Sequence, residues 1–267
     1  MKSNFLFRIA GLFFFINFYF SSCTPHFYKP KPLEPVLLTK KNQLKINTIT
    51  DFSIGTVSAA YSPKQNLGIQ LGVGSNHYKS SGTDNTGRDT IYLNEYYFNP
   101  YLSVGYYKNI SQDILFEAYG GIGMYNYKNT AISYLKSMKN INIYIQPTIA
   151  YIQKNFDASF TLRIDYFNRN KTRITDSVLS ADDVKKYQFL NYKNYFFVQP
   201  GFTIKGGLKN VKAQFQISES IPFSKNYRSI YGYGYQFLVF DTFRNKNKLL
   251  YSFGLTIELN DLFNKKK

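Results

Sequence analysis

The sequence predicts an all-β fold: an antiparallel up-and-down transmembrane β-barrel of ten strands, with eight strands as the alternative. Three observations predict it. Apolar and polar residues alternate singly along most of the chain, which is the period of strands with two unlike faces. The alternating stretches reach the roughly 9–11 residues that a transmembrane strand needs. The links between these stretches are short and long in turn, as in outer-membrane barrels.

The composition agrees with strands of this kind. Aromatic residues make up 19% of the 267 residues, yet the mean hydropathy is only −0.31. A soluble core would gather its apolar residues into runs, whereas this chain distributes them singly. In YSFGLTIEL, residues 251–259, the apolar positions share one face and Ser252, Gly254, Thr256 and Glu258 share the other. Such strands place apolar side chains toward lipid and polar ones toward a lumen.

The N-terminus predicts a cleaved secretory signal peptide. A short basic start, MKSNFLFR, leads into residues 12–20 (LFFFINFYF), an apolar core too short to span a bilayer as a helix. Ser21 and Ser22 then precede Cys23, the single cysteine of the chain. Small residues directly before a Cys resemble the lipobox of bacterial lipoproteins. That resemblance implies a diacylglycerol on the Cys23 thiol, cleavage before Cys23, and acylation of the new amino terminus by a fatty acid such as palmitate. An ordinary signal peptide that contains a Cys is the alternative.

Behind Cys23 lies a segment rich in proline and basic residues. Proline fixes its own backbone angle and lacks an N–H donor, so we expect an extended tether here. The rest of the chain contains no linker and is expected to form one domain. The expected parts are a lipoprotein signal peptide over residues 1–22, a lipid-anchored Pro-rich tether over 23–41, a barrel over 42–260 and a basic C-terminal tail over 261–267.

The formal net charge of +17 would suit a nucleic-acid partner. An exported lipoprotein does not meet nucleic acid where it works, so we expect no such partner. The lysines accompany abundant Asn, Ile, Tyr and Phe, which is the mixture that AT-rich codons give. The functional alternative is attraction to anionic lipid head groups, to which the terminal Lys265, Lys266 and Lys267 would contribute.

The strands and links follow from the alternation. The strands are expected near residues 42–50, 53–61, 67–79, 92–107, 112–127, 139–153, 156–169, 193–206, 210–221 and 247–260. The short links are expected at 62–66, 109–112, 154–155 and 207–209, and the long polar links near 80–91, 128–138, 170–192 and 222–246. The first link, near residues 50–52, is tight where a long one is due. Outer-membrane barrels have short periplasmic turns and longer outer loops. The even strand count therefore places both termini, and a lipid on Cys23, on the periplasmic side.

Three prolines argue against continuous strands. Pro100, Pro147 and Pro200 fall inside expected strands, where each removes a ladder hydrogen bond and normally marks a bulge or an edge. We expect bulges at these positions. If the prolines instead ended their strands, the count would fall to eight.

The stretches CTPHFYKPKPLEPVLLTKKNQLKI, SAAYSPKQNLGIQLGVGS and FEAYGGIGMY resemble small lipid-anchored β-barrel proteins of Bacteroidetes outer membranes. The resemblance covers nearly the whole mature chain. It implies a bacterial outer-membrane location and carries no established activity.

One set of charged residues is expected to face the lumen. A ten-stranded barrel is largely filled by its own side chains, so we expect these charges to form an interior ion-pair network rather than to line a conducting path. By strand phase the set is Lys45, Glu117, Asp157, Arg163, Asp165, Lys205, Lys212 and Glu258.

Ser75 and His77 are the one pair that could be catalytic. They lie two residues apart, and the phase of Ile69, Leu71 and Val73 turns them toward lipid. Outer-membrane lipid A deacylases also place a His and a Ser two apart on a lipid-facing wall, although the order here is reversed. No acidic partner can be assigned, and the sequence has no GxSxG, no phosphate loop and no paired-His metal site. We therefore expect no enzyme activity, no cofactor and no metal.

These observations predict a non-enzymatic, lipid-anchored outer-membrane β-barrel with an envelope-structural or surface-interaction role. One alternative is a periplasmic lipocalin-like ligand-binding barrel on a lipid tether, which would turn apolar residues inward. A second is a lipid A-modifying barrel hydrolase. The expected partners are outer-membrane lipid and the barrel-assembly machinery. The stretch SFGLTIEL, residues 252–259, resembles the C-terminal signal by which that machinery recognises barrel proteins. The sequence names no surface partner.

Overall fold

The computed structural model describes residues 30–51, 54–83, 90–129, 135–174, 194–222 and 249–259. The predicted signal peptide, Cys23, the predicted C-terminal tail and part of each predicted long link lie outside these residues. Within the described ranges, no helix is long and apolar enough to cross a membrane.

The described chain forms one antiparallel sheet of eleven strands. The strands are β1 (Leu44–Thr50), β2 (Gly55–Lys64), β3 (Leu67–Thr83), β4 (Thr90–Asn109), β5 (Ile114–Asn129), β6 (Leu135–Ile152), β7 (Phe156–Ile174), β8 (Asn194–Gly207), β9 (Val211–Glu219), β10 (Ile221–Pro222) and β11 (Leu249–Glu258).

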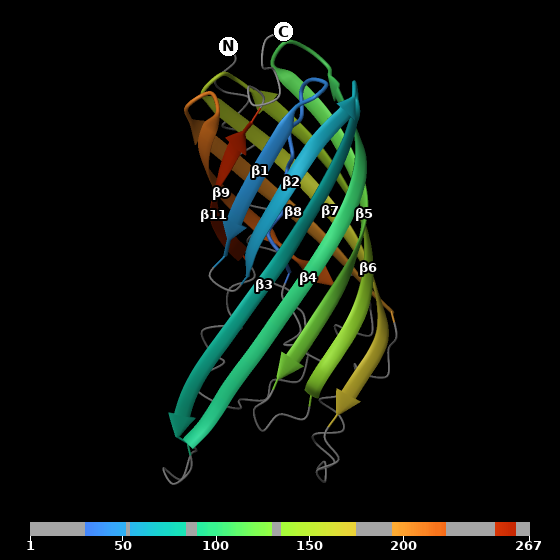
Figure 1. Ribbon diagram of the computed structural model, residues 1–267, viewed down its shortest axis with the longest axis vertical. Helices are drawn as coiled ribbons and strands as arrows, with labels where there is room; N and C mark the ends of the chain where they lie inside the picture. Colours follow the sequence, from blue (N-terminus) through green and yellow to red (C-terminus); the bar gives the residue numbers. More distant parts are fainter. Residues whose placement is uncertain are drawn as a thin grey trace.

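The sheet closes on itself. Each strand from β1 to β8 pairs with the next along the chain, and β11 lies between β9 and β1 (Figure 1). The two-residue β10 continues β9 against β8 in the same register, since Ser218 pairs with Gly201 and Ile221 pairs with Val198. Together β9 and β10 form one barrel strand, so the closed barrel has ten strands. The predicted ten-stranded up-and-down barrel is confirmed, and the eight-stranded alternative is wrong.

The two ends of the barrel differ in their links. The short links at 65–66, 110–113, 153–155 and 208–210 lie at the end where β1 begins and β11 ends, which we call the short-link end (the top of Figure 1). The opposite end, where β3 and β4 extend farthest, is the long-link end. The tight link between β1 and β2 is also at this end, where the Ile54 backbone N–H donates to Asp51 Oδ1 at 2.6 Å.

The three prolines interrupt the ladder without shifting its register. Pairing of β4 with β5 stops after Phe98 and resumes at Tyr101, on either side of Pro100, in the same register. Pro147 interrupts the pairing of β6 with β7, and Pro200 that of β8 with β9, in the same way. Each proline lacks the N–H that the ladder needs there, while its strand stays paired on the other side. The predicted bulges are therefore wrong at these positions.

The barrel wall carries apolar side chains on its outer face and polar side chains on its inner face, which is the reverse of a soluble protein. In β6, Ile143 is 53% exposed on the outer face, whereas its neighbour Asn142 is 1% exposed on the inner face. This pattern continues around the barrel, so the outer face carries what we call the apolar belt. The belt includes Val57, Leu71, Leu102, Val104, Ile122, Ile143, Ile145, Ile149, Phe202, Tyr251, Phe253 and Leu255. A lipocalin-like barrel needs the reverse arrangement, so the burial pattern favours the membrane barrel.

Candidate functional site: the occupied lumen

The lumen is occupied by the chain's own N-terminal segment. Every residue from Pro30 to Leu38 (PKPLEPVLL) is buried, and this stretch, the lumen segment, runs inside the barrel before the chain turns into β1. The proline-rich sequence predicts an extended tether here, whereas residues 30–38 lie buried inside the barrel. The site is therefore built from the lumen segment and the inner faces of the strands around it.

Glu117 of β5 is the first anchor of the lumen segment. Its two carboxylate oxygens accept the backbone N–H groups of Val36 and Leu37, at 2.9 and 2.8 Å. The Glu117 side chain is fully buried, so these two charge-assisted bonds replace the water that the carboxylate loses. The predicted lumen charge thus binds a peptide backbone rather than a neighbouring cation alone.

Two lysines of the predicted set hold the same part of the segment through its carbonyl groups. Lys45 Nζ donates to the Leu37 carbonyl at 2.5 Å, and Lys205 Nζ donates to the Pro35 carbonyl at 3.0 Å. Pro35 cannot donate a hydrogen bond itself, but its carbonyl can accept one. The carboxylate and both ammonium groups therefore satisfy donors and acceptors of one short stretch of backbone.

Uncharged polar side chains continue this pattern deeper in the lumen. Gln216 of β9 makes two bonds to Leu33: it accepts the backbone N–H at 2.8 Å and donates to the carbonyl at 3.0 Å. Gln146 of β6 donates to the Glu34 carbonyl at 3.2 Å, and the Tyr101 hydroxyl donates to the Glu34 carboxylate. The side-chain amide of Gln216 thus pairs with both the backbone N–H and the backbone carbonyl of Leu33, as a neighbouring strand would in a sheet.

Arg163 of β7 joins the wall to the beginning of the segment. Its Nε and Nη2 donate to Gln146 Oε1 at 2.9 and 2.6 Å, and its Nη1 lies 3.5 and 3.4 Å from the carbonyl oxygens of Lys31 and Pro32. Gln199 of β8 donates to the same Lys31 carbonyl at 3.1 Å. Arg163 is only 2% exposed, so these acceptors replace its hydration.

The apolar side chains of the segment fill the lumen toward the short-link end. Burial of an aliphatic side chain of this size contributes about 1.5–3 kcal/mol. The segment and the wall thus share a small core, which comprises Val36, Leu37, Leu38, Ala60, Tyr107, Leu115, Tyr119 and Ala150.

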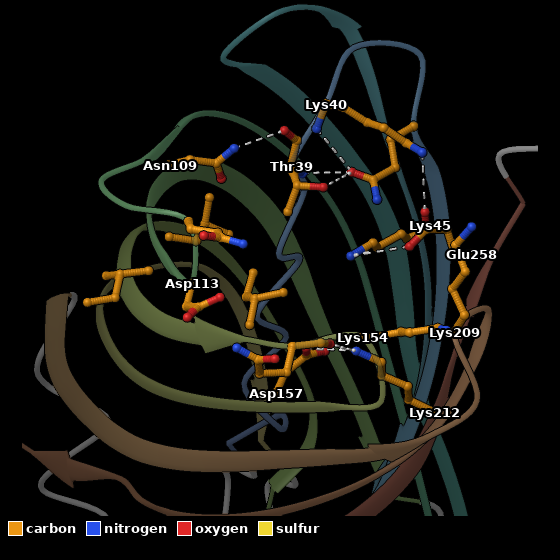
Figure 2. Close-up of a pocket in the computed structure, with 16 residues that line it drawn as sticks. Thr39, Lys40, Lys45, Asn109, Asp113, Lys154, Asp157, Lys209, Lys212 and Glu258 are labelled. Atoms are coloured by element: carbon orange, nitrogen blue, oxygen red, sulfur yellow. Dashed lines mark hydrogen bonds and ion pairs between the residues drawn. The ribbon is translucent and has the colours of Figure 1, made fainter. Parts of the chain in front are cut away.

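Three other predicted charges, Asp157, Lys212 and Glu258, lie around the mouth at the short-link end. Lys212 Nζ is 2.7 Å from Asp157 Oδ1, and Glu258 lies 3.9 Å from Lys45 and 4.0 Å from Lys40. Figure 2 shows these side chains around an open cavity of about 450 Å³. The lining of this cavity is mostly polar and charged, and it includes Thr39, Lys40, Lys45, Asn109, Asp113, Leu115, Lys154, Asp157, Lys209, Lys212 and Glu258.

Seven members of the predicted set are buried on the inner face, and Glu258 is half-buried at the mouth. Among the described residues, ion pairs join Lys45 to Glu258 and Lys212 to Asp157. Glu117, Arg163 and Lys205 instead bond to the backbone of the lumen segment. Asp165 is 2% exposed and lies two residues beyond Arg163, toward the long-link end. Sequence reasoning missed Gln146 and Gln216, since a polar inward position shows no partner until the segment is placed.

Ser75 and His77 are both exposed on the outer face of β3. His77 Nε2 lies 2.8 Å from Asn94 Oδ1, and its ring packs edge-on to Tyr96 with 6.4 Å between centroids. The described contact of Nε2 is thus with Asn94 rather than with Ser75.

The comparisons with known proteins concern the fold. The barrel is similar to a NanC porin at 7% identity and a TM-score of 0.34, over 81% of this chain and 99% of that chain. It is similar to the N-terminal β-barrel domain of Pseudomonas aeruginosa OprF at 9% identity and a TM-score of 0.27, over 82% and 98%. A major outer membrane protein from Thermus thermophilus is 13% identical with a TM-score of 0.34, over 81% and 98%. No protein-family model matches the chain, and no curated protein matches its sequence. At these TM-scores the likeness says nothing of what this chain binds or conducts.

Proposed function

We propose that this chain is a non-enzymatic, lipid-anchored β-barrel of the bacterial outer membrane, and that its lumen is closed by its own N-terminal segment. Its role is then structural, within the envelope, or one of interaction at the cell surface through the long links. The observation that carries the proposal is the inversion of the two wall faces around a peptide-filled lumen.

The apolar belt supports the membrane location. Large apolar side chains on the outer face are about one-third to two-thirds exposed, from Phe116 at 36% to Leu71 at 62%. A monomeric soluble protein rarely exposes a contiguous apolar surface of more than a few hundred Å². A closed sheet leaves no unpaired backbone edge, which is the condition for crossing hydrocarbon with strands. Both features suit a wall immersed in lipid.

The filled lumen supports a closed barrel. A channel needs a continuous path of water, but the lumen segment lies inside the ten-stranded barrel and bonds to several of its strands. The inward glutamines, lysines and carboxylates are used to hold that segment. We therefore propose a sealed structural barrel rather than a porin.

The lipid anchor is supported by the sequence Ser21–Ser22–Cys23, which lies outside the described residues. Replacing Cys23 with Ala should abolish labelling by radioactive palmitate in growing cells. Undiminished labelling of that variant would rule the anchor out. Three or so acyl chains would hold the protein firmly, since each buried methylene contributes about 0.8 kcal/mol.

The location is tested by membrane fractionation followed by electrophoresis with and without heating. We expect the protein in the outer-membrane fraction, with faster migration of the unheated form, because a closed barrel stays compact in detergent. Recovery in the soluble fraction, or identical migration of the two samples, would contradict the proposal. The proposed assembly partner, the barrel-assembly machinery, would act on β11, the strand that closes the sheet against β1 and β9.

A further inference from the structure

We infer that the outer face of β5, β6 and β7 carries a binding site for the phosphate groups of lipid A, the phosphorylated glycolipid of the outer leaflet. The site is the lysine cluster, which comprises Lys128 of β5, Lys139 of β6 and Lys171 of β7. The inference rests on the proposed function, which places the long-link end of the barrel in the outer leaflet. The formal net charge predicts attraction to any anionic surface, whereas the lysine cluster assigns it to one place on the wall and to one head group.

The three lysines share one face of three neighbouring strands near the long-link end (Figure 1). All three side chains are exposed. Asn126, two residues before Lys128, pairs with Lys139, so the two lysines are diagonal neighbours on this face. The acidic residues within these three strands are Glu117, Asp157 and Asp165, which are all buried on the inner face. No carboxylate of these strands therefore neutralises the lysine cluster on the outer face.

A bulge in β7 turns Lys171 to the outer face. The pairing of β6 with β7 shifts by one residue at Asn170, so that Lys139 pairs with Lys171 rather than with Asn170. Before the bulge, odd-numbered residues of β7 such as Phe167 are buried on the inner face, whereas Lys171 beyond it is exposed. Bulges at the rims of barrels commonly re-aim a side chain in this way. Without the extra residue, the alternation of β7 would turn Lys171 into the lumen.

The bulge brings two like charges directly opposite each other, because Lys139 and Lys171 are partners in the ladder. The Cβ atoms of such a pair are about 4.5–5.5 Å apart, and like charges at this spacing destabilise the pairing of two strands. An anion between the two ammonium groups would replace this repulsion by two attractions. Phosphate oxygens suit that position, since they accept charge-assisted hydrogen bonds from lysine.

The lysine cluster lies at the height of the lipid head groups. On the outer face of β5, apolar residues extend over ten residue steps from Ile114 to Met124, and Asn126 and Lys128 follow. Ten residues at about 3.3 Å each, in a strand tilted by roughly 40°, span about 25 Å, which is the height of the apolar band of such a barrel. Lys139 is level with Asn126, its partner in the ladder. The ammonium groups are therefore just beyond the hydrocarbon.

Aromatic side chains mark the same level on neighbouring strands. Tyr166 of β7 packs against Phe196 of β8 with 4.8 Å between ring centroids. On β4, Tyr96 stacks on Phe98 with 6.4 Å between centroids. Aromatic girdles of this kind lie at the membrane interfaces of transmembrane barrels. Lys171 follows Tyr166 toward the long-link end, so the lysine cluster is just outside the girdle.

The charge of the lysine cluster favours lipid A over a phospholipid. A phosphate monoester carries a charge of about −1.5 to −2 at pH 7 and has three acceptor oxygens. The phosphodiester of a phospholipid carries a single negative charge. Two opposed lysines with a third on the diagonal match the monoester better, and lipid A presents phosphate monoesters at the level of the head groups.

The test measures lipid binding to the purified full-length protein in detergent by native mass spectrometry. The probes are phosphorylated lipid A, the same lipid A after phosphatase treatment, and phosphatidylglycerol. Lys139→Gln with Lys171→Gln removes the two opposed charges, whereas Lys139→Arg with Lys171→Arg keeps them. The matched control is Lys64→Gln with Lys108→Gln, which removes two exposed lysines at the short-link end. Heat-modifiable migration shows that each variant has folded.

We expect the glutamine variant of the lysine cluster to bind phosphorylated lipid A roughly 25-fold more weakly than the wild type does, because each lysine at an anionic lipid surface contributes about fivefold. The arginine variant and the control variant should bind it as the wild type does. Phosphatase-treated lipid A and phosphatidylglycerol should bind the wild type more weakly than phosphorylated lipid A does.

Unchanged binding by the glutamine variant of the lysine cluster, or an equal loss in the control variant, overturns the inference. Equal binding of phosphatidylglycerol and phosphorylated lipid A to the wild type also overturns it, because the site would then select no head group. In each of these cases, heat-modifiable wild-type protein in the outer-membrane fraction leaves the proposed function standing. Wild-type protein that is not heat-modifiable contradicts the proposed function itself, and the inference falls with it.

Discussion

The inner and outer faces of the same strands obey different rules. In β6 the outward residues Ile145 and Ile149 are 52% and 50% exposed, whereas the inward Gln146 is 2% exposed and bonded to Arg163 and to the lumen segment. The outer face needs only apolar surface, because lipid acyl chains form no hydrogen bonds with the side chains. The inner face needs particular atoms at particular heights, because it surrounds a peptide whose N–H and C=O groups must be paired.

This difference sets the expected cost of a substitution. A change on the inner face leaves a named donor or acceptor unpaired in a buried site. A change on the outer face costs what the new side chain loses in lipid, which depends on depth.

The largest effect is expected from Arg163→Leu. The substitution removes the group that bonds to Gln146 and to the carbonyls of Lys31 and Pro32, and it leaves these acceptors buried. We expect the free energy of unfolding to fall by about 3–5 kcal/mol, as when one partner of a buried charged network is removed. Urea titration in phospholipid vesicles, read by heat-modifiable migration, measures it. The control Ile164→Leu, one residue away on the outer face, should cost less than about 1.5 kcal/mol. Equal losses of unfolding free energy for the two variants would contradict the hydrogen-bond network around Arg163.

The outer face is tested with a charge at two depths. Ile143→Lys, near the middle of β6, should cost about 2–4 kcal/mol in the same titration. Ile114→Lys, at the first residue of β5 near the short-link end, should cost about 1 kcal/mol or less, because its ammonium group reaches the head groups. Equal costs at the two positions would show that the wall is not immersed at the depth proposed.

Closure of the barrel is tested at Gly254 in β11. A Cβ at this position would meet the Thr48 backbone carbonyl of β1 and would lie 2.7 Å from Gln214 Nε2. We expect Gly254→Ala to cost about 1–3 kcal/mol of unfolding free energy. The matched control is Gly206→Ala, where nothing lies within 4 Å of the new methyl group. If both alanines are tolerated equally, β11 is not packed against β1 as described.

The smallest effect is expected from His77→Ala. This exposed side chain bonds to Asn94, and surface changes of this kind stay within about 0.5 kcal/mol. The number of acyl chains on lipid A, measured by mass spectrometry, should be unchanged in cells that carry the variant. A changed acylation pattern that Asn94→Ala does not reproduce would revive the hydrolase alternative for Ser75 and His77.

The strands could be predicted from the sequence because their cause is local. Alternation of period two, measured along the chain, decides which side chain faces lipid, and the ten observed strands overlap the ten predicted ranges. The effect of the prolines was predicted less well, because no bulge forms at Pro100, Pro147 or Pro200. Each proline interrupts the pairing with only one of its two neighbouring strands. Which neighbour is affected depends on the side to which the missing N–H would have pointed.

The lumen segment could not be predicted because its cause is distant in the sequence. Val36 bonds to a residue 81 positions away, Leu33 to one 183 positions away, and Lys31 to one 132 positions away. Local composition rich in proline and lysine predicts a solvated tether. The available signal was the apolar residues beside the prolines: Leu33 lies between Pro32 and Pro35, and Val36 to Leu38 follow Pro35. A tether in water does not need them.

Occupancy of the lumen by residues 30–38 is tested most directly by a cross-link from Leu33 to the wall. A Cβ on Gly201 would lie against Leu33 Cδ1, so Leu33→Cys with Gly201→Cys brings two thiols within reach of a disulfide. The control pairs Leu33→Cys with Phe202→Cys, whose side chain is on the outer face of β8. Mild oxidation of heat-modifiable protein, followed by mass spectrometry of its peptides, should show a disulfide in the first pair and none in the second. A folded first pair that stays reduced would contradict an occupied lumen.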